Sequence, residues 1–388
     1  MRVITLRLKN WMNFKSLAAM DLHERMFVIG PNASGKSNLL DALRFLRDVA
    51  RPAGPKPAGG GLQKAVSDRG GLSKLRCLNA KRDPEVRIEI DVEADGVVWH
   101  YALGFKGEGS GNHRIVISHE SVKKDGKILF SRPDDKDEKD PERLVQTHLE
   151  YIGANAEFRE LVHFLSEITY LHLVPQLLKF GDQIGGNLIE QDPFGQALLL
   201  RIAATPERTR SARLRRISTA LKGVVPQFSE LRFQKDPVTG APHLEANFRH
   251  WRPSGAWQRE NQFSDGTLRL IGLLWALVDG QSLLLLEEPE LSLNEAIVRR
   301  LPALIDKVQQ QSKHARQVIV TTHSEALLRD TSIAAEEVIR LQPTEEGTEI
   351  SHVGAEEAIM LKSGLSVGEV LLPATRPEGL GQLELGLS

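Results

Sequence analysis

MFVIGPNASGKSNLLDALRFLRDVA, residues Met26 to Ala50, is the stretch that decides the fold. It opens with a short apolar run, Met26–Ile29, and residues 30–37 then fit the pattern G-x-x-x-x-G-K-S/T. Apolar residues follow at helical spacing, namely Leu39, Leu43, Leu46 and Ala50. A glycine-rich turn between a buried strand and a helix is typical of a phosphate-binding P-loop, and the match at every fixed position disfavours a chance turn.

The residue types in this loop suit a nucleoside triphosphate. Glycines let backbone N–H groups turn toward phosphate oxygens at the positive end of a helix dipole. Lys36 supplies a positive charge between the β- and γ-phosphates, and the hydroxyl of Ser37 is a hard oxygen ligand for Mg²⁺. The sequence therefore predicts ATP and Mg²⁺ as ligands. The predicted nucleotide-binding residues are Gly30, Pro31, Asn32, Ala33, Ser34, Gly35, Lys36, Ser37 and Asn38.

A second stretch, SLLLLEEPELSLNEA from Ser282 to Ala296, ends a run of leucines in two adjacent glutamates. Four consecutive leucines indicate a strand buried on both faces. A P-loop ATPase needs a second strand that ends in carboxylates. We therefore expect Glu287 to hold Mg²⁺ through water, and Glu288 to orient and deprotonate the attacking water. Positive charge from Mg²⁺ and Lys36 would offset the repulsion between the two acids. The alternative is an ordinary exposed acid pair at a strand end.

Two further segments indicate the class of P-loop protein. In NQFSDGTLRLIGLLWALV, Ser264 and Gly266 lead into an apolar helix whose N-terminus is a second anion site. In QVIVTTHSEALL, His323 stands just beyond a β-branched run. With these segments the chain resembles the ABC ATPases, and within them the RecF/SMC-like branch called AAA_21. The resemblance implies that Ser264 and Gly266 form the signature motif, which closes on the γ-phosphate held by a second subunit. It also implies that His323 contacts the γ-phosphate.

The resemblance assigns roles to other positions as well. ITYLHLVPQLL is similar to the strand that leads to the Q-loop, which makes Gln176 the residue expected to sense Mg²⁺ and the attacking water. Lys15 would lie near the nucleotide. PELSLNEA is similar to the D-loop region, with Asn294 where the family usually has histidine. The implied catalytic residues are Glu288, His323 and Gln176, and the implied Mg²⁺ ligands are Ser37, Gln176 and Glu287.

An α/β fold follows from the same resemblance: an ABC-type P-loop ATPase head with a mixed parallel core sheet, a flanking antiparallel sheet and a helical subdomain. The stretch VRIEIDVEADGVVWHYALGF alternates in polarity and predicts a hairpin with its turn at Asp95-Gly96. We divide the chain into an N-terminal ATPase lobe (1–145), a helical insert (146–260), a C-terminal ATPase lobe (261–372) and a flexible tail (373–388).

Composition limits the other classes. The 388 residues carry a net charge of −1, so contact with DNA would depend on a local patch. Cys77 is the single cysteine and the N-terminus does not resemble a signal peptide, which predicts a cytoplasmic protein. The most apolar window, LIGLLWALVDGQSLLLL, is interrupted by Asp279 and Gly280. It predicts a helix, a turn and a strand rather than a membrane span.

One expected helix is unusually basic. It covers Thr205 to Gly223, with Thr205 as its N-cap and Pro206 at its first position. Its inward-facing residues would be Leu214, Ile217 and Leu221, and its arginines are Arg208, Arg210, Arg213, Arg215 and Arg216. Such a helix could track the phosphates of DNA, or it could be a solvated face paired with nearby acids.

These observations predict an ATP-hydrolysing switch that forms a head-to-tail homodimer on binding ATP. Its expected role is in DNA maintenance, DNA repair or defence against foreign DNA. The alternative is a slow nucleotide-gated scaffold or sensor that controls a separate effector such as a nuclease. A AAA+ ring motor is disfavoured because the S-x-G helix precedes the second carboxylate strand. A P-loop kinase is disfavoured because no acceptor pocket or lid is recognisable.

The C-terminus carries one more motif. Gln382, Leu383, Leu385 and Leu387 form the pattern Q-L-x-L-x-L. This pattern resembles the peptide by which bacterial translesion polymerases dock on the sliding clamp. There the glutamine would hydrogen-bond to the clamp while leucines fill an apolar pocket. The alternatives are that these leucines pack on the protein's own sheet, or that the tail binds nothing.

Overall fold

The structure is a computed structural model that describes residues 1–52, 59–109, 114–180, 194–249, 256–311 and 315–375. Contacts divide the chain into two compact units, and each gathers segments that are distant in sequence. The first unit contains Met1–Thr169, Ser282–Leu285 and Ala315–Ser388, and the second contains Tyr170–Gln281 and Leu286–His314. This grouping differs from a division into consecutive lobes.

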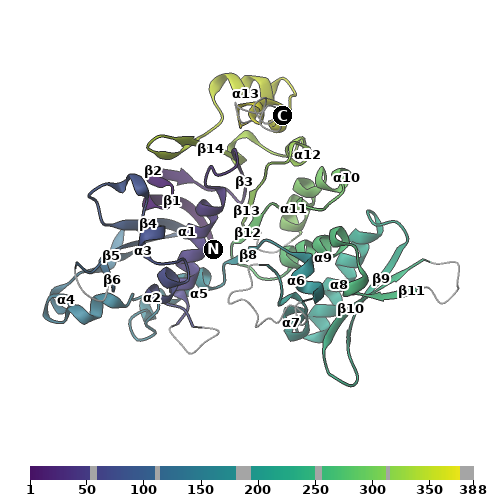
Figure 1. Cartoon of the computed structure of the whole chain (residues 1–388), viewed down its shortest axis with the longest axis horizontal. Helices are drawn as coiled ribbons and strands as arrows, with labels where there is room; N and C mark the ends of the chain where they lie inside the picture. Colours follow the sequence, from purple (N-terminus) through teal and green to yellow (C-terminus); the bar gives the residue numbers. More distant parts are fainter. Residues whose placement is uncertain (53–58, 110–113, 181–193, 250–255, 312–314, 376–388) are drawn as a thin grey trace, which may run out of the picture. The chain divides into compact units, whose positions relative to one another are not determined.

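An antiparallel sheet occupies much of the first unit (Figure 1). Its strands, in spatial order, are β2 (Phe14–Asp21), β1 (Arg2–Trp11), β4 (Val86–Ala94), β5 (Val97–Gly107), β6 (Ile115–Lys124) and β7 (Lys127–Arg132). The predicted hairpin is confirmed, because β4 pairs with β5 across a turn at Asp95 and Gly96. Both turn residues have positive φ, 49° and 82°, as a tight hairpin requires.

A second sheet, most of whose residues belong to the first unit, is mixed, as expected. Its strands, in spatial order, are β15 (Gly347–Ser351), β14 (Val338–Thr344), β3 (Arg25–Ile29), β13 (Val318–Thr321), β12 (Leu284–Glu287) and β8 (Thr169–Leu171). Strand β3 runs parallel to both β13 and β14, and all five of its residues are buried. A strand buried on both faces needs the continuous apolar run seen at Met26–Ile29.

Helix α1 (Lys36–Ala50) begins at the end of the glycine-rich loop and buries the apolar residues predicted from their spacing. Its Phe45 ring lies 5.2 Å from Trp11 of β1 and 5.3 Å from Phe105 of β5, so aromatic contacts join the helix to the antiparallel sheet. The other α-helices described in the unit are α2 (Leu62–Ser67), α3 (Leu72–Leu75), α4 (Asp135–Lys139), α5 (Arg159–Ser166), α12 (Glu325–Leu328), α13 (Ala355–Lys362) and α14 (Val367–Leu371).

The second unit is mainly helical, with a small sheet that the sequence did not predict. Its helices are α6 (Pro175–Phe180), α7 (Leu198–Ala204), α8 (Glu207–Lys222), α9 (Asp265–Val278), α10 (Glu295–Val298) and α11 (Leu301–Gln310). Its sheet has the order β11 (Ala256–Arg259), β10 (Pro242–Phe248) and β9 (Phe228–Lys235). The core between them includes Leu214, Ile217 and Leu221 of α8, which face inward as predicted.

The predicted N-cap of α8 was wrong. The helix begins at Glu207, Pro206 takes the N-cap position, and no side chain caps it. The hydroxyl of Thr205 instead donates to the carbonyl oxygen of Arg201 at 2.9 Å, one turn earlier in α7. Threonine readily makes this local bond to the backbone of its own helix, so the residue closes α7 rather than opening α8.

Two expectations concern the membrane and the tail. Within the described ranges, no helix combines the length and the apolar character that crossing a bilayer requires. Pro373–Thr375 form a short 3-10 helix. The rest of the predicted tail, with Gln382, Leu383, Leu385 and Leu387, lies outside the described residues.

Candidate functional site

The glycine-rich loop leaves the carboxyl end of β3 and leads directly into α1. Gly30 and Gly35 have positive φ, 155° and 96°. A Cβ atom added to Gly35 would lie 2.0 Å from Nδ2 of Asn13, so only glycine fits at this position. The ammonium group of Lys36 donates to the carbonyl oxygens of Gly30 and Pro31, each at 3.0 Å, and so lies across the loop.

Asn13 holds the loop from outside. Its Nδ2 atom donates to the carbonyl oxygen of Ser34 at 3.1 Å and to the hydroxyl of Thr348. Its Oδ1 atom accepts from Nδ2 of Asn38 at 2.8 Å, and Thr348 donates to the same Ser34 carbonyl at 2.9 Å. Sequence reasoning missed both supports. It selected Lys15 instead, whose ammonium group pairs with the exposed Glu346.

His323 follows the strand that pairs with β3, the strand before the glycine-rich loop. It stands two residues beyond β13, the strand parallel to β3, and its side chain is exposed. The backbone N–H of Thr322 donates to the carbonyl oxygen of Val28 at 3.2 Å. The loop and His323 therefore leave the carboxyl ends of neighbouring parallel strands, the edge of an α/β sheet at which ligands bind.

The loop fits a triphosphate. The first turn of α1 presents backbone N–H groups at the positive end of a 15-residue helix. Ser34 is fully buried within the loop, and its hydroxyl has no hydrogen-bond partner among the described residues. A buried polar atom without a partner is costly unless a ligand meets it. Ser37 lies on the exposed side of α1, where a cation bound to phosphate could reach its hydroxyl.

The predicted acid pair lies in the second unit, at the end of β12. The hydroxyl of Tyr170 donates to Oε2 of Glu287, and Nδ1 of His172 lies 3.3 Å from the carbonyl oxygen of Glu287. Glu288 has a φ of 43°, the left-handed region that few residues other than glycine adopt. Such strain costs on the order of 1–3 kcal/mol and gathers at functional sites, which agrees with a role for this residue.

Ser264 and Gly266 lie at the N-terminus of α9. Ser264 caps the helix, because its hydroxyl oxygen accepts from the backbone N–H of Thr267 at 3.2 Å. A Cβ atom on Gly266 would lie 2.7 Å from the carbonyl oxygen of Ser292, a residue of the predicted D-loop with φ of 61°. Asn294 caps the next helix, α10, by accepting from the backbone N–H of Ala296 at 2.9 Å.

Gln176 also contacts the start of α9. It lies on α6, and its Nε2 atom donates to Oδ2 of Asp265 at 2.6 Å. Lys179, one turn later, donates to Oδ1 of the same carboxylate at 2.6 Å. The structure therefore places the predicted Q-loop residue against the helix that carries Ser264 and Gly266. Asp265 and Lys179 were not selected from the sequence.

Arg269 is a further residue that sequence reasoning missed. It lies one turn after Asp265 on α9 and only 7% of its surface is exposed. Its Nε and Nη1 atoms are buried and have no hydrogen-bond partner among the described residues. Burial lowers the pKa of the guanidinium, while the carboxylates of Asp265, Glu290 and Glu288 oppose this. An arginine inside an apolar helical pattern was the only signal in the sequence.

The predicted site residues fall into two groups, one in each unit. Residues 30–38 and His323 share the first unit, while Gln176, Ser264, Gly266, Glu287 and Glu288 share the second.

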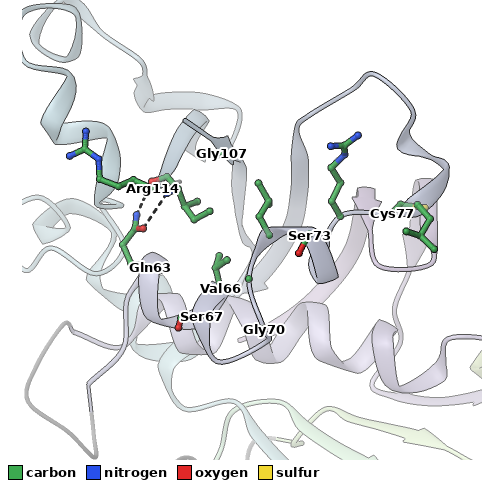
Figure 2. Close-up of a pocket in the computed structure, with 13 residues that line it drawn as sticks. Gln63, Val66, Ser67, Gly70, Ser73, Cys77, Gly107 and Arg114 are labelled. Carbon is green, nitrogen blue, oxygen red and sulfur yellow. Dashed lines mark hydrogen bonds between the residues drawn. The ribbon is translucent and has the colours of Figure 1, made fainter. Parts of the chain in front are cut away.

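A cavity of about 1020 Å³ lies elsewhere in the first unit, between α2, α3 and the start of β6 (Figure 2). Its wall is fixed by Gln63, whose amide bonds twice to the backbone of Ile115, at 2.7 and 3.2 Å. None of the predicted nucleotide-binding residues lines this cavity.

Comparison with known proteins gives one family and one fold. Residues 25–329 match the family model AAA_21, described as "AAA domain, putative AbiEii toxin, Type IV TA system". Among curated proteins, none matches the chain. A crystal structure of an SMC head bound to the C-terminal winged-helix domain of ScpA aligns with a TM-score of 0.54 at 19% identity, over 92% of this chain and 100% of the other.

A second solved structure agrees. The SMC head domain of Pyrococcus furiosus, with an extended coiled coil and the C-terminal domain of ScpA bound, aligns with a TM-score of 0.52 at 15% identity. The alignment covers 94% of this chain and 99% of that one. At this level of identity the likeness concerns the fold, and the fold is that of an ABC-class ATPase head.

Proposed function

The chain belongs to the AAA_21 family of ABC-class ATPases, and on this premise we propose that it binds and hydrolyses ATP as a switch. ATP would join two copies head to tail, and hydrolysis would release them. The switch would act in DNA maintenance, DNA repair or defence against foreign DNA.

One observation carries this proposal. The glycine-rich loop and His323 leave adjacent parallel strands that are joined by the hydrogen bond from Thr322 to Val28. A phosphate held by the loop, with Lys36 across it, would therefore have an exposed imidazole beside the terminal phosphate. This arrangement suits recognition of a triphosphate, because the imidazole could contact a γ-phosphate, which a diphosphate lacks.

Each predicted residue has a role in the proposed reaction. Lys36 and the loop N–H groups hold the phosphates, and Glu288 takes a proton from the attacking water. Ser37, Glu287 and Gln176 would hold Mg²⁺, which neutralises the phosphate charge when bound. Ser264 and Gly266 of the partner subunit would close on the γ-phosphate from the opposite side. Because both copies bind that phosphate, its loss removes the contact between them.

Size-exclusion chromatography tests the proposal. Glu288→Gln keeps the size of the side chain but cannot accept the proton, so this variant should bind ATP and accumulate as a dimer. Lys36→Ala should remain monomeric at the same ATP concentration, because it lacks the charge that holds the phosphates. A Glu288→Gln protein that binds ATP and stays monomeric at saturation would contradict the two-copy site.

A second candidate function is a nucleotide-gated scaffold that controls a separate effector, such as a nuclease. It is favoured by the two similar SMC head structures, each of which has a domain of ScpA bound. Slow hydrolysis, with a partner released or activated in one nucleotide state, would distinguish it from the first function.

We also propose a sliding clamp as a partner. The clamp would bind the C-terminal motif formed by Gln382, Leu383, Leu385 and Leu387. A peptide covering residues 379–388 should bind the clamp with a dissociation constant in the micromolar range, which corresponds to a binding free energy of about −8 kcal/mol. Replacement of Gln382 and Leu383 by alanine should abolish the binding heat in calorimetry. No heat from the unchanged peptide would remove the clamp from the proposal.

A further inference from the structure

The arginines of helix α8 fall into two groups, one packed against the second unit and one exposed to solvent. Arg210 and Arg213 lie against the body of the second unit. Arg210 stacks over the ring of Phe233 at 4.2 Å and donates to the backbone of residues 203 and 205. Arg213 pairs with Asp279 at 2.6 Å, a carboxylate that it shares with Arg201. These contacts tie α8 to β9 and α9, its neighbours in Figure 1, and so explain two of the basic residues structurally.

The other basic residues of α8 face solvent. The exposed cations are Arg208, Arg215, Arg216 and Lys222. Arg216 donates to the neutral amide of Gln311 at 3.3 Å. None of the four forms an ion pair with another described residue. Even Glu207, the acidic residue in the first turn of the same helix, is not paired with any of them. We call the surface formed by these four residues, together with Ser211, Ala212 and Thr219, the α8 stripe.

The geometry of the α8 stripe is regular. Arg208, Arg215 and Lys222 are spaced by seven residues, which places them on one side of the helix about 10 Å apart. Ser211, Ala212 and Thr219 lie between them and are exposed. Small side chains let another molecule approach the helix closely, and the hydroxyl of Ser211 could donate to a phosphate oxygen. The hydroxyl of Thr219 already donates to the carbonyl oxygen of Arg215 at 3.0 Å. The stripe covers roughly 21 Å along the helix axis.

The absence of ion pairs in the stripe is informative because acids are abundant. The chain has 51 acidic and 50 basic residues, and some exposed arginines in the same unit are paired, for example Arg299 with Glu295 at 2.6 Å. Exposed cations about 10 Å apart repel one another only weakly, but without acidic partners they leave the surface of the stripe positive. A positive surface suits an anionic partner.

We propose that the α8 stripe binds the phosphate backbone of duplex DNA. The inference deepens the proposed function and rests on it, since it names the surface by which the switch would hold DNA. The stripe has no large exposed apolar side chain, whereas the centre of a protein interface is rich in aromatic and aliphatic groups. Arginine, lysine, serine and threonine are the side chains that contact DNA phosphates. A stripe of this length reaches roughly three to four phosphates.

An acidic peptide is the competing occupant, and the structure shows where it would bind. A groove of about 440 Å³ lies beside α8, between α9 and α11. Ile217, Leu274 and Leu304 line it, and Arg216 and Lys307 stand at its edges. Such a peptide would use the groove and the cations at its edges, but would leave Arg208 at the far end of the helix without a role.

Fluorescence anisotropy with a labelled 30-base-pair duplex tests the proposal on the full chain. Between 50 and 200 mM KCl, the logarithm of the binding constant should fall with the logarithm of salt at a slope of about −3 to −4. Arg208→Gln/Arg215→Gln should weaken binding by about tenfold or more and make the slope shallower by about 2. The matched control is Lys106→Gln/Lys127→Gln. It removes the same charge from exposed positions of the first unit and should leave both quantities unchanged.

Nucleotide binding is measured on the same samples. The stripe variant should bind ATP as the unchanged protein does, because its P-loop lies in the other unit. Loss of ATP binding by the unchanged protein would overturn the proposed function. ATP binding with no DNA binding at 50 mM KCl would overturn only this inference. Equal DNA affinity of the stripe variant and the unchanged protein would also overturn it, and so would an equal loss in the control.

Discussion

The carbonyl oxygen of Ser292 occupies the space into which a side chain on Gly266 would project, 2.7 Å from the ideal Cβ position. The first turn of α9 and the loop after β12 are thus in backbone contact within the second unit. We expect Gly266→Ala to force them apart, since overpacking of this kind typically costs about 1–3 kcal/mol. ATP binding should persist, while ATP hydrolysis should fall at least about tenfold.

Gly223→Ala is the matched control for that substitution. It lies in the same unit with φ of −81°, and its Cβ would meet the nearest atom at an ordinary 3.6 Å. Steady-state phosphate release and a melting curve for both variants decide the matter. If Gly266→Ala hydrolyses ATP at the rate of Gly223→Ala, the contact with Ser292 has no part in the reaction.

Asn13→Ala should weaken ATP binding without unfolding the protein. The substitution removes the side-chain bonds to Ser34 and Asn38, while Thr348 still donates to Ser34. The loop then has more conformations to lose when phosphate binds, and we expect the dissociation constant to rise about tenfold, or about 1.4 kcal/mol. Asn79→Ala is the control, because Asn79 also bonds to a backbone carbonyl, that of Glu345, but does not touch the loop. Identical ATP titrations of the two variants would show that Asn13 does not position the loop.

Arg269→Met should separate stability from activity. Methionine fills a similar volume and removes a buried charge whose Nε and Nη1 atoms lack hydrogen bonds, so the melting temperature should stay the same or rise. Hydrolysis should fall, because the cation near Glu288 and Glu290 is lost. Leu270→Met on the same helix is the control for methionine itself. A drop in stability of several kcal/mol in Arg269→Met alone would mean that the guanidinium is held by the fold rather than kept for the reaction.

Two buried groups in the first unit give opposite dependences of stability on pH. Burial raises the pKa of Glu120 to about 7, above the usual value of 4.5. Between these pH values the folded carboxyl keeps a proton that the unfolded one has released, so the free energy of unfolding falls as pH rises. Burial lowers the pKa of His148 to about 4 from 6.5, so its contribution to that free energy rises with pH across this range.

The two effects offset each other between about pH 4.5 and 6.5, and single substitutions should reveal each one. Glu120→Gln should make the free energy of unfolding rise with pH, by up to about 1.4 kcal/mol per pH unit. His148→Gln should make it fall with pH. Urea unfolding followed by tryptophan fluorescence, at several pH values, measures both. Parallel profiles for the two variants would refute the assignment.

Local patterns in the sequence predicted the parts of this structure that depend on neighbouring residues. The turn at Asp95 and Gly96 and the inward face of α8 require only the conformational preferences and periodicity of a few positions. The support of the P-loop could not be predicted in this way, because Asn13 and Thr348 are 335 residues apart in the chain. The same is true of Gln176 and Asp265, which are 89 residues apart.

The three-stranded sheet of the second unit was missed for another reason. In β9, an eight-residue strand, only Phe228 and Leu231 are buried, so no clean alternation marks it. The loop from Asp236 to Gly240 does carry turn residues, with Asp236 bonded to the N–H groups of Val238 and Thr239, each at 3.0 Å. Attention to that turn would have indicated a hairpin in a region assigned to helices.

The pairing of β3 has a consequence for synthesis on the ribosome. Both neighbours of this strand, β13 and β14, are encoded near the other end of the chain, so Ile29 waits for about 290 residues before Val318 is made. At about 5–20 residues per second, translation leaves the strand that precedes the P-loop without its partners for roughly 15–60 s. A nascent or truncated chain that ends before β13 should therefore neither bind ATP nor protect its apolar edge, and it would depend on chaperones until about the last fifth emerges.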